Sequence, residues 1–275
     1  MKVFISVDME GISGIVSREE VNPKDGRDYP SARKAMTMDV NAAIKGAVAS
    51  GATEVWVRDS HAEMTNLILD ELDPSANVVK GGPTPLSMVE SLNETFDCMF
   101  LIGYHSMSGT LCSVLDHTYS GRCVSELRIN GRPSGEFVMS AMVAGYYGVP
   151  VALISGDYGV VQQAREVIPN IVGVEVKKGI SRYSAGCIHP EVARKKIYSG
   201  AKEAIKLVRQ KKITPFNAGS PIEIQLDLVN TGMADLSSMM PCAERTGPRT
   251  IKYIAKDPIE AYKFIVCAVT LASIT

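Results

Sequence analysis

The chain has 275 residues and a formal net charge of −1; hydrophobic residues make up 45% of it and charged residues 21%. These values are typical of a globular protein that is long enough to bury a large core without disulfide or metal staples. They argue against a nucleic-acid-binding protein, because such proteins carry a basic surplus or a basic stripe that this sequence lacks.

The cysteines and the N-terminal segment indicate in which cellular compartment the protein is found. None of the six cysteines forms a CxxC pair, so we expect neither a disulfide framework nor a cysteine-ligated zinc site. The apolar run Val3–Val7 is too short for a signal peptide, and no segment approaches the ~20 apolar residues that a membrane span needs. We therefore expect a cytoplasmic protein with no membrane or nucleic-acid partner.

Strand and helix patterns alternate through the first hundred residues. A helix is predicted from Pro30 to Ser50, with proline in its first turn and Gly51 after its end. A short helix is predicted at Leu86–Leu92. Apolar strands are predicted at Val3–Val7, Glu54–Val57, Ala76–Val79 and Cys98–Ile102. Apolar strands interleaved with helices favour a mostly parallel sheet that helices flank on both faces.

The second half adds a hairpin signal and a smaller C-terminal portion. Asn130-Gly131 after the alternating segment Val124–Ile129 is a strong turn signal. The remaining predicted elements are helices at 135–147, 160–167, 190–210 and 258–272 and strands at 151–154, 172–176, 222–228 and 250–254. The connection Pro215–Pro221 predicts a boundary between a main α/β domain, 1–214, and a C-terminal α+β lobe or extension, 215–275.

Acidic and histidine residues follow three of the predicted strands. Asp8 and Glu10 follow the first strand and share a face while the chain stays extended. His61 follows the second strand and His105 follows the strand that begins at Cys98. In open α/β sheets, ligands bind at the carboxyl ends of the strands, and this mixture of oxygen and nitrogen donors suits zinc and its neighbours.

The same residues also have ordinary structural interpretations. A strand-end aspartate is often a turn or cap residue, and a lone histidine is often a satisfied core residue. Asp59 could orient His61 or form a turn. His189, before Pro190, is interpreted as a loop or capping residue. Spacing alone leaves both interpretations open, since no HExxH or paired-cysteine motif is present.

Several short motifs together closely resemble the bacterial D-aminopeptidase family of binuclear zinc peptidases. The most specific is the N-terminal SxDxEG pattern within Ser6–Gly14. The others are Asp59-Ser60-His61, Gly103-Tyr104-His105, the segment Asn130–Glu136 and Val143–Val149 (VAGYYGV). They keep their order over most of the chain and continue more weakly into the tail.

The resemblance implies a complete site. It assigns two Zn²⁺ ions to Asp8, Glu10, His61, His105 and Glu136, with Asp8 bridging the metals. It assigns catalysis to His117, either as a nucleophile or as an acid/base beside a water that the two metals activate. The residue patterns alone did not single out Glu136, because an acid in the first turn of a helix is favoured by the helix dipole.

The implied activity is hydrolysis of the N-terminal residue of short D-amino-acid peptides or amides. The resemblance also implies a large ring-like homo-oligomer, such as a decamer. The sequence leaves two alternative functions open. One is another two-metal hydrolase acting on a non-peptide amide or a phosphoester, for which Arg58 and Arg122 would be candidate anion ligands. The other is a nucleotide-binding or regulatory α/β domain, although Gly11–Gly14 does not match a phosphate-binding loop.

Overall fold

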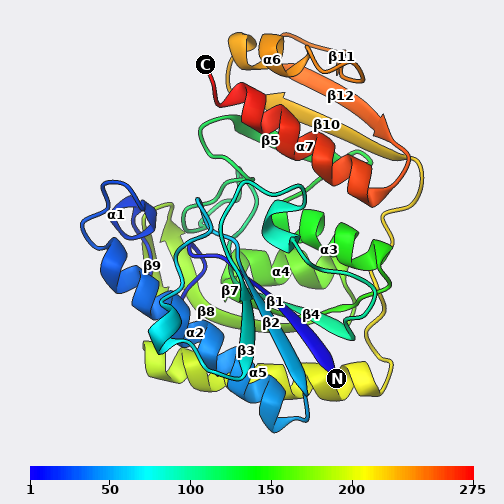
Figure 1. The fold of residues 1–275 in the computed structure, drawn as a ribbon. Helices are drawn as coiled ribbons and strands as arrows, with labels where there is room; N and C mark the ends of the chain where they lie inside the picture. The colour runs from blue at the N-terminus through cyan, green and yellow to red at the C-terminus, as the bar shows by residue number, and fades with distance from the viewer.

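The computed structural model describes residues 1–275 as a seven-stranded sheet with helices on both faces and a second, five-stranded sheet above it (Figure 1). The first sheet is parallel except for its last strand and has the order β3-β2-β1-β4-β7-β8-β9. Its strands are β1 Lys2–Val7, β2 Glu54–Asp59, β3 Ala76–Val79, β4 Cys98–Tyr104, β7 Val151–Asp157, β8 Val172–Ser181 and β9 Ser184–Cys187. The predicted mostly parallel α/β fold is confirmed.

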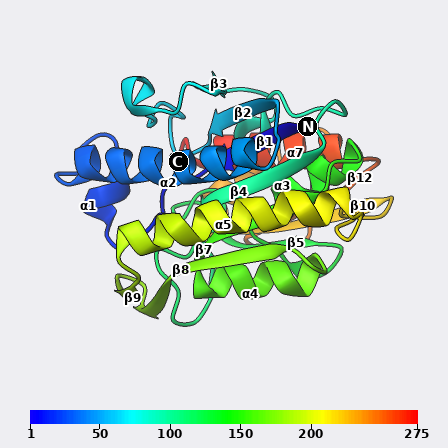
Figure 2. The same ribbon diagram turned by 90° about the horizontal axis from the view of Figure 1, so that it is seen from below.

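Helices cover this sheet in two layers. The long helices α2 (Tyr29–Ala49) and α5 (Pro190–Arg209) lie side by side on one face, as Figure 2 shows from below. The other face packs against α3 (Glu136–Tyr146) and α4 (Tyr158–Val167). Burial on both faces explains why β4 and β7 are apolar along almost their whole length rather than alternating.

The second sheet is antiparallel, with the order β11-β12-β10-β5-β6. Its strands are β5 Val124–Ile129, β6 Arg132–Pro133, β10 Ile222–Leu228, β11 Glu244–Arg245 and β12 Thr250–Ala255; α6 (Thr231–Ser237) and α7 (Pro258–Ala272) pack with it. Asn130 and Gly131 both have positive φ, 52° and 74°, as a tight hairpin turn requires. The sheet thus joins the C-terminal segment to residues 124–133, and the division near residue 215 stays a prediction.

Short elements account for most differences from the expected pattern. The helix predicted at Leu86–Leu92 is wrong: only a 3-10 turn, Ser87–Val89, forms there, and the positive φ of Ser87 and Ser91 interrupts a longer helix. The single-turn elements at Arg18–Val21 (α1) and Leu69–Glu71 were not predicted. No helix has both the length and the apolar character needed to cross a membrane.

The topology places three strand ends together. β1 lies between β2 and β4 and is parallel to both, with Val7 level with Asp59 on one side and with Ile102 on the other. Strand order reverses at this point, which is where open α/β sheets bind ligands. Gly11 lets the chain pass close to β4, because a Cβ at this position would lie 1.8 Å from the carbonyl oxygen of Tyr104.

Candidate metal centre

Side chains from the ends of β1, β2 and β4 meet one from the first turn of α3. The five residues predicted to bind metal are all at least 93% buried: Asp8, Glu10, His61, His105 and Glu136. Three carboxylates in one buried space repel one another unless positive charge lies between them. The sequence prediction that these residues converge agrees with the geometry of the fold.

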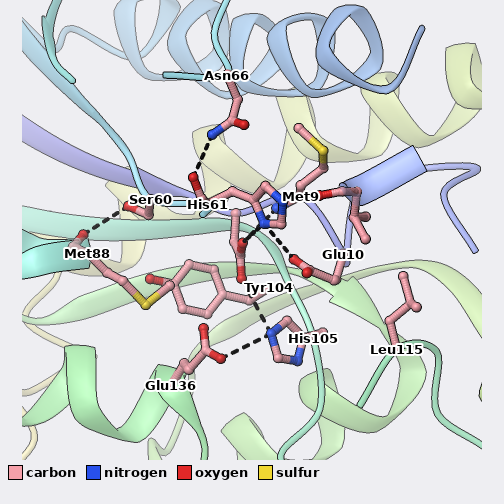
Figure 3. Close-up of polar contacts among 12 residues, drawn as sticks. Met9, Glu10, Ser60, His61, Asn66, Met88, Tyr104, His105, Leu115 and Glu136 are labelled. Carbon is pink, nitrogen blue, oxygen red and sulfur yellow. Dashed lines mark hydrogen bonds and ion pairs between the residues drawn. The ribbon is translucent and has the colours of Figure 1, made fainter. Parts of the chain in front are cut away.

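The contacts divide the cluster into two connected halves. Nδ1 of His61 lies 3.2 Å from Oδ1 of Asp8 and 3.0 Å from Oε2 of Glu10. Nε2 of His105 lies 3.5 Å from Oδ2 of Asp8 and 3.3 Å from Oε1 of Glu136. Figure 3 shows the rings of His61 and His105 directed at the carboxylates of this cluster. The two oxygens of Asp8 therefore face different histidines.

Backbone carbonyls fix the orientation of both rings. Nε2 of His61 lies 2.6 Å from the carbonyl oxygen of Val21, and Nδ1 of His105 lies 2.9 Å from that of Ser106. A carbonyl only accepts hydrogen bonds, so in each ring the nitrogen facing it donates the proton. The other nitrogen faces the carboxylates, where it can give up its proton and offer its lone pair to a bound cation, as in metal-ligating histidines.

Two buried atoms of the cluster lack a hydrogen-bond partner. These are Oε2 of Glu10 and Nε2 of His105; each lies within ion-pair distance of a neighbour but makes no hydrogen bond of normal geometry. Buried polar atoms are nearly always satisfied. The ligand atoms of Asp8, Glu10 and His105 lie within 4.8 Å of one another. A divalent cation fits this donor set, because it would satisfy both atoms and neutralise the carboxylates.

The protonation equilibria reflect the same crowding. Burial, reinforced by the charges of Glu10 and Glu136, raises the pKa of Asp8 to about 7. Burial acts to raise the pKa of Glu10, but the neighbouring imidazoles, His61 foremost, together hold that pKa well below its usual range. Burial acts to lower the pKa of His105, but the neighbouring carboxylates, Glu136 foremost, together raise it to about 10. The three buried carboxylates thus favour a positive charge placed between them.

Glu136 is held in place by two neighbours. It is the first residue of α3, after the N-cap Gly135, where the helix dipole favours an acid. Its Oε1 accepts a hydrogen bond from the backbone N–H of Tyr119 at 2.7 Å and lies near His105. Because both partners are distant in sequence, residue patterns could not separate this glutamate from an ordinary helix-start acid.

His117 lies at the edge of the cluster. Its ring stacks on that of His105 with a centroid distance of 4.1 Å, and its Nε2 is 3.6 Å from Glu136. Nδ1 of His117 faces the carbonyl of Leu115 at 2.8 Å. The side chain is 19% exposed, compared with 1% for His105. Burial and the charge of His105 lower the pKa of His117. Of these two histidines, His117 is the one that reaches the open space.

That open space is a cavity of about 600 Å³, a volume typical of small-molecule sites. The buried cluster contributes Asp8, Glu10, His61 and Glu136 to its wall, and His117 lies on the same wall. Arginine and lysine side chains at Arg18, Lys24 and Arg122 also line it. The cluster is therefore accessible to a molecule the size of a short peptide.

Two buried basic residues near the site were not predicted to have these roles. The ammonium of Lys177, on β8, donates to the backbone carbonyls of Glu10, Ile12 and Ile15 and so fixes the loop after β1. Arg58 donates to the carbonyls of Ser87 and Gly81. Both were hard to find in the sequence, since lysine and arginine are almost never fully buried.

The structure decides between the alternative interpretations of Asp59 and of His189. The carboxylate of Asp59 accepts hydrogen bonds from the backbone of Asn66 and Leu67 and from the Asn66 side chain, not from the His61 ring. Asn66 also donates to the carbonyl of His61 (Figure 3). Asp59, the last residue of β2, thus fixes the loop that follows and acts on the site only through Asn66. His189 is the N-cap of α5, as predicted.

Comparisons with known proteins agree with this geometry. A family model described as D-aminopeptidase matches residues 1–267. A D-aminopeptidase of Bacillus subtilis (strain 168) is 38% identical over 273 residues, which cover 99% of this chain and 98% of that protein. Among solved structures, a Zn-dependent D-aminopeptidase, DppA from Bacillus subtilis, described as a self-compartmentalizing protease, superposes with a TM-score of 0.96. It is 36% identical, and the match covers 100% of this chain and 99% of that one.

Proposed function

This chain belongs to the D-aminopeptidase family, and on that premise we propose that it is a zinc-dependent aminopeptidase that releases the N-terminal residue of short D-amino-acid peptides. The observation that carries the proposal is the buried cluster at the ends of β1, β2 and β4, where two oriented imidazoles and three carboxylates face one space. The name of the solved relative supports zinc as the metal.

Two zinc ions are proposed, with Asp8 shared between them. One ion would be held by Glu10 and His61 with Oδ1 of Asp8, and the other by His105 and Glu136 with Oδ2 of Asp8. The arrangement of contacts supports this division, because each oxygen of Asp8 already faces a different histidine. Bound zinc would polarise the scissile carbonyl and lower the pKa of a water molecule towards ~7.

His117 is proposed as the group that moves a proton. Its Nδ1 is committed to the carbonyl of Leu115, so its Nε2 is the nitrogen that can exchange a proton in the cavity. Cleavage of an amide requires a proton on the leaving nitrogen. Because the pKa of His117 is lowered, its neutral imidazole would accept the proton that the attacking water loses and pass it to that nitrogen. Stacking on His105 and the nearby Glu136 fix the plane of the ring.

The volume of the cavity also limits the length of the substrate. About 600 Å³ holds a peptide of a few residues, whose amino-terminal end would lie at the buried ligands. We further propose a large ring-like homo-oligomer, as the description of the solved relative suggests. A cytoplasmic location is proposed because six free cysteines fit a reducing compartment.

The phosphoester alternative loses one of its two candidate anion ligands in the structure. The Arg58 side chain is fully buried, and its donors point to carbonyls of the loop 81–87 rather than into the cavity. Only Arg122 of the two candidate anion ligands lines the site.

The proposal is tested with matched chromogenic substrates: D-aminoacyl anilides, their L-enantiomers and an aryl phosphate. We expect hydrolysis of the D-anilides only, loss of activity after dialysis against a chelator, and recovery on addition of zinc. Faster cleavage of the phosphate or the L-anilides would contradict the proposed substrate class, and full activity after verified metal removal would contradict the proposed metal dependence.

A further inference from the structure

The charged side chains that line the active-site cavity differ in burial. The buried ones are acids, Asp8, Glu10 and Glu136. The exposed ones, which form the rim, are three cations, Arg18, Lys24 and Arg122, and a single acid, Asp25. The buried acids are accounted for by the proposed metal ions, whereas nothing in the proposed reaction accounts for the basic rim.

Arg122 is the rim cation without a partner. Lys24 lies 3.9 Å from Glu63, and the guanidinium of Arg18 lies over the ring of Tyr183 at 5.7 Å. Arg122 is exposed and makes neither an ion pair nor a side-chain hydrogen bond within the chain. A guanidinium has five donors in a planar fork that matches a carboxylate. Arg122 is therefore free to bind a planar anion that enters the cavity.

The loop after His117 brings Arg122 to the cavity wall. Gly121 packs on His117, because a Cβ at this glycine would lie 3.2 Å from the Cβ of the histidine. This close contact folds the loop back, so the residue that follows Gly121 lines the same cavity as the His117 ring. Arg122 therefore lies on the same cavity wall as His117 and not on a separate surface.

We propose that Arg122 binds the free C-terminal carboxylate of a short peptide whose amino end lies at the metal cluster. This inference rests on the proposed function and adds a specificity-determining residue to it. An extended peptide spans at most ~3.5 Å per residue, so a carboxylate held at the rim of this one cavity limits the length of the peptide. A longer peptide would carry its carboxylate out of the cavity.

The test compares a D,D-dipeptide with its C-terminal amide, using the zinc-loaded enzyme. The two substrates differ only in the charge that Arg122 is proposed to bind. For Arg122→Ala we expect KM for the free acid to rise by at least ~10-fold, the size of one charge-assisted hydrogen bond. We expect KM for the amide and kcat for both substrates to stay within about 2-fold, because the contact is remote from the scissile bond.

Arg209→Ala is the matched control, since Arg209 is an exposed arginine in the last turn of α5 that does not line the cavity. This variant should leave KM and kcat unchanged for both substrates. Calorimetric titration of the inactive His117→Ala enzyme should show the same loss of acid binding when Arg122→Ala is added. An equal change for acid and amide, or no change for either, would overturn the role of Arg122 while leaving the aminopeptidase assignment intact. Wild-type enzyme that cleaves neither substrate would overturn the proposed function itself.

Discussion

At the scale of single residues, the site is defined by which nitrogen of each histidine is free. His61, His105 and His117 each direct one ring nitrogen at a backbone carbonyl, and the other nitrogen faces the carboxylate cluster. A carbonyl is a weak but permanent orienting group, because the backbone that carries it is fixed by the fold. The fold therefore sets which nitrogen of each ring faces the carboxylates before any ion binds.

The His117→Ala variant separates metal binding from proton transfer. The five proposed ligands remain, so we expect zinc content to stay at the wild-type level. Turnover should fall by at least ~100-fold, since a positioned acid/base contributes 10² to 10⁴ in rate. Steady-state kinetics and elemental analysis of the same preparation measure both quantities.

His189→Ala serves as the control, because His189 caps α5 and does not line the cavity. Wild-type turnover by His117→Ala would remove His117 from the mechanism. Loss of zinc from that variant would instead identify His117 as a ligand, a role its position with His105 and Glu136 would allow.

At the scale of elements, the loop between β1 and α1 is fixed by a residue from a distant strand. Lys177 on β8 reaches across the sheet edge and donates to three carbonyls of residues 10–15. No carboxylate pairs with its ammonium, and burial lowers the pKa of Lys177 to about 8. This lysine therefore holds Glu10 through its main chain.

Replacing Lys177 by methionine keeps the length of the side chain and removes its donors. Three buried carbonyls would lose their partner, so we expect the free energy of unfolding to fall by roughly 3 kcal/mol or more. Zinc affinity should fall as well, because the backbone of Glu10 is released. Lys178→Met is the control, since Lys178 is the exposed neighbour on the same strand. Denaturation and zinc titration that do not distinguish the two variants would contradict this role.

The elements show what could be read from the sequence and what could not. The apolar runs of β1, β4 and β7 and the Asn130-Gly131 turn are local signals, and the structure confirms them. Asp8, Glu10, His61 and His105 could be proposed because parallel strands end at one edge. Glu136, Lys177 and Arg58 act through partners far away in the chain, so no local pattern marks them.

At the scale of the whole molecule, the helix α7, which packs on the antiparallel sheet, reaches a segment of the cavity wall. Tyr262 on α7 is fully buried, and its hydroxyl accepts a hydrogen bond from the backbone N–H of Met88 at 3.2 Å. Ser6 of β1 donates to the carbonyl of the same Met88 at 2.8 Å. The segment 87–88, which lines the cavity, is thus held between β1 and α7. We expect the smaller portion to be needed for activity although it supplies no proposed ligand.

The central claim is that residues remote in the chain bind two zinc ions between the ends of β1, β2 and β4. Anomalous diffraction at the zinc edge, from crystals of the zinc-loaded protein, tests it most directly. The account predicts two peaks inside the cluster, both in contact with Asp8, one beside Glu10 and His61 and the other beside His105 and Glu136. A map without zinc among these five side chains would contradict it.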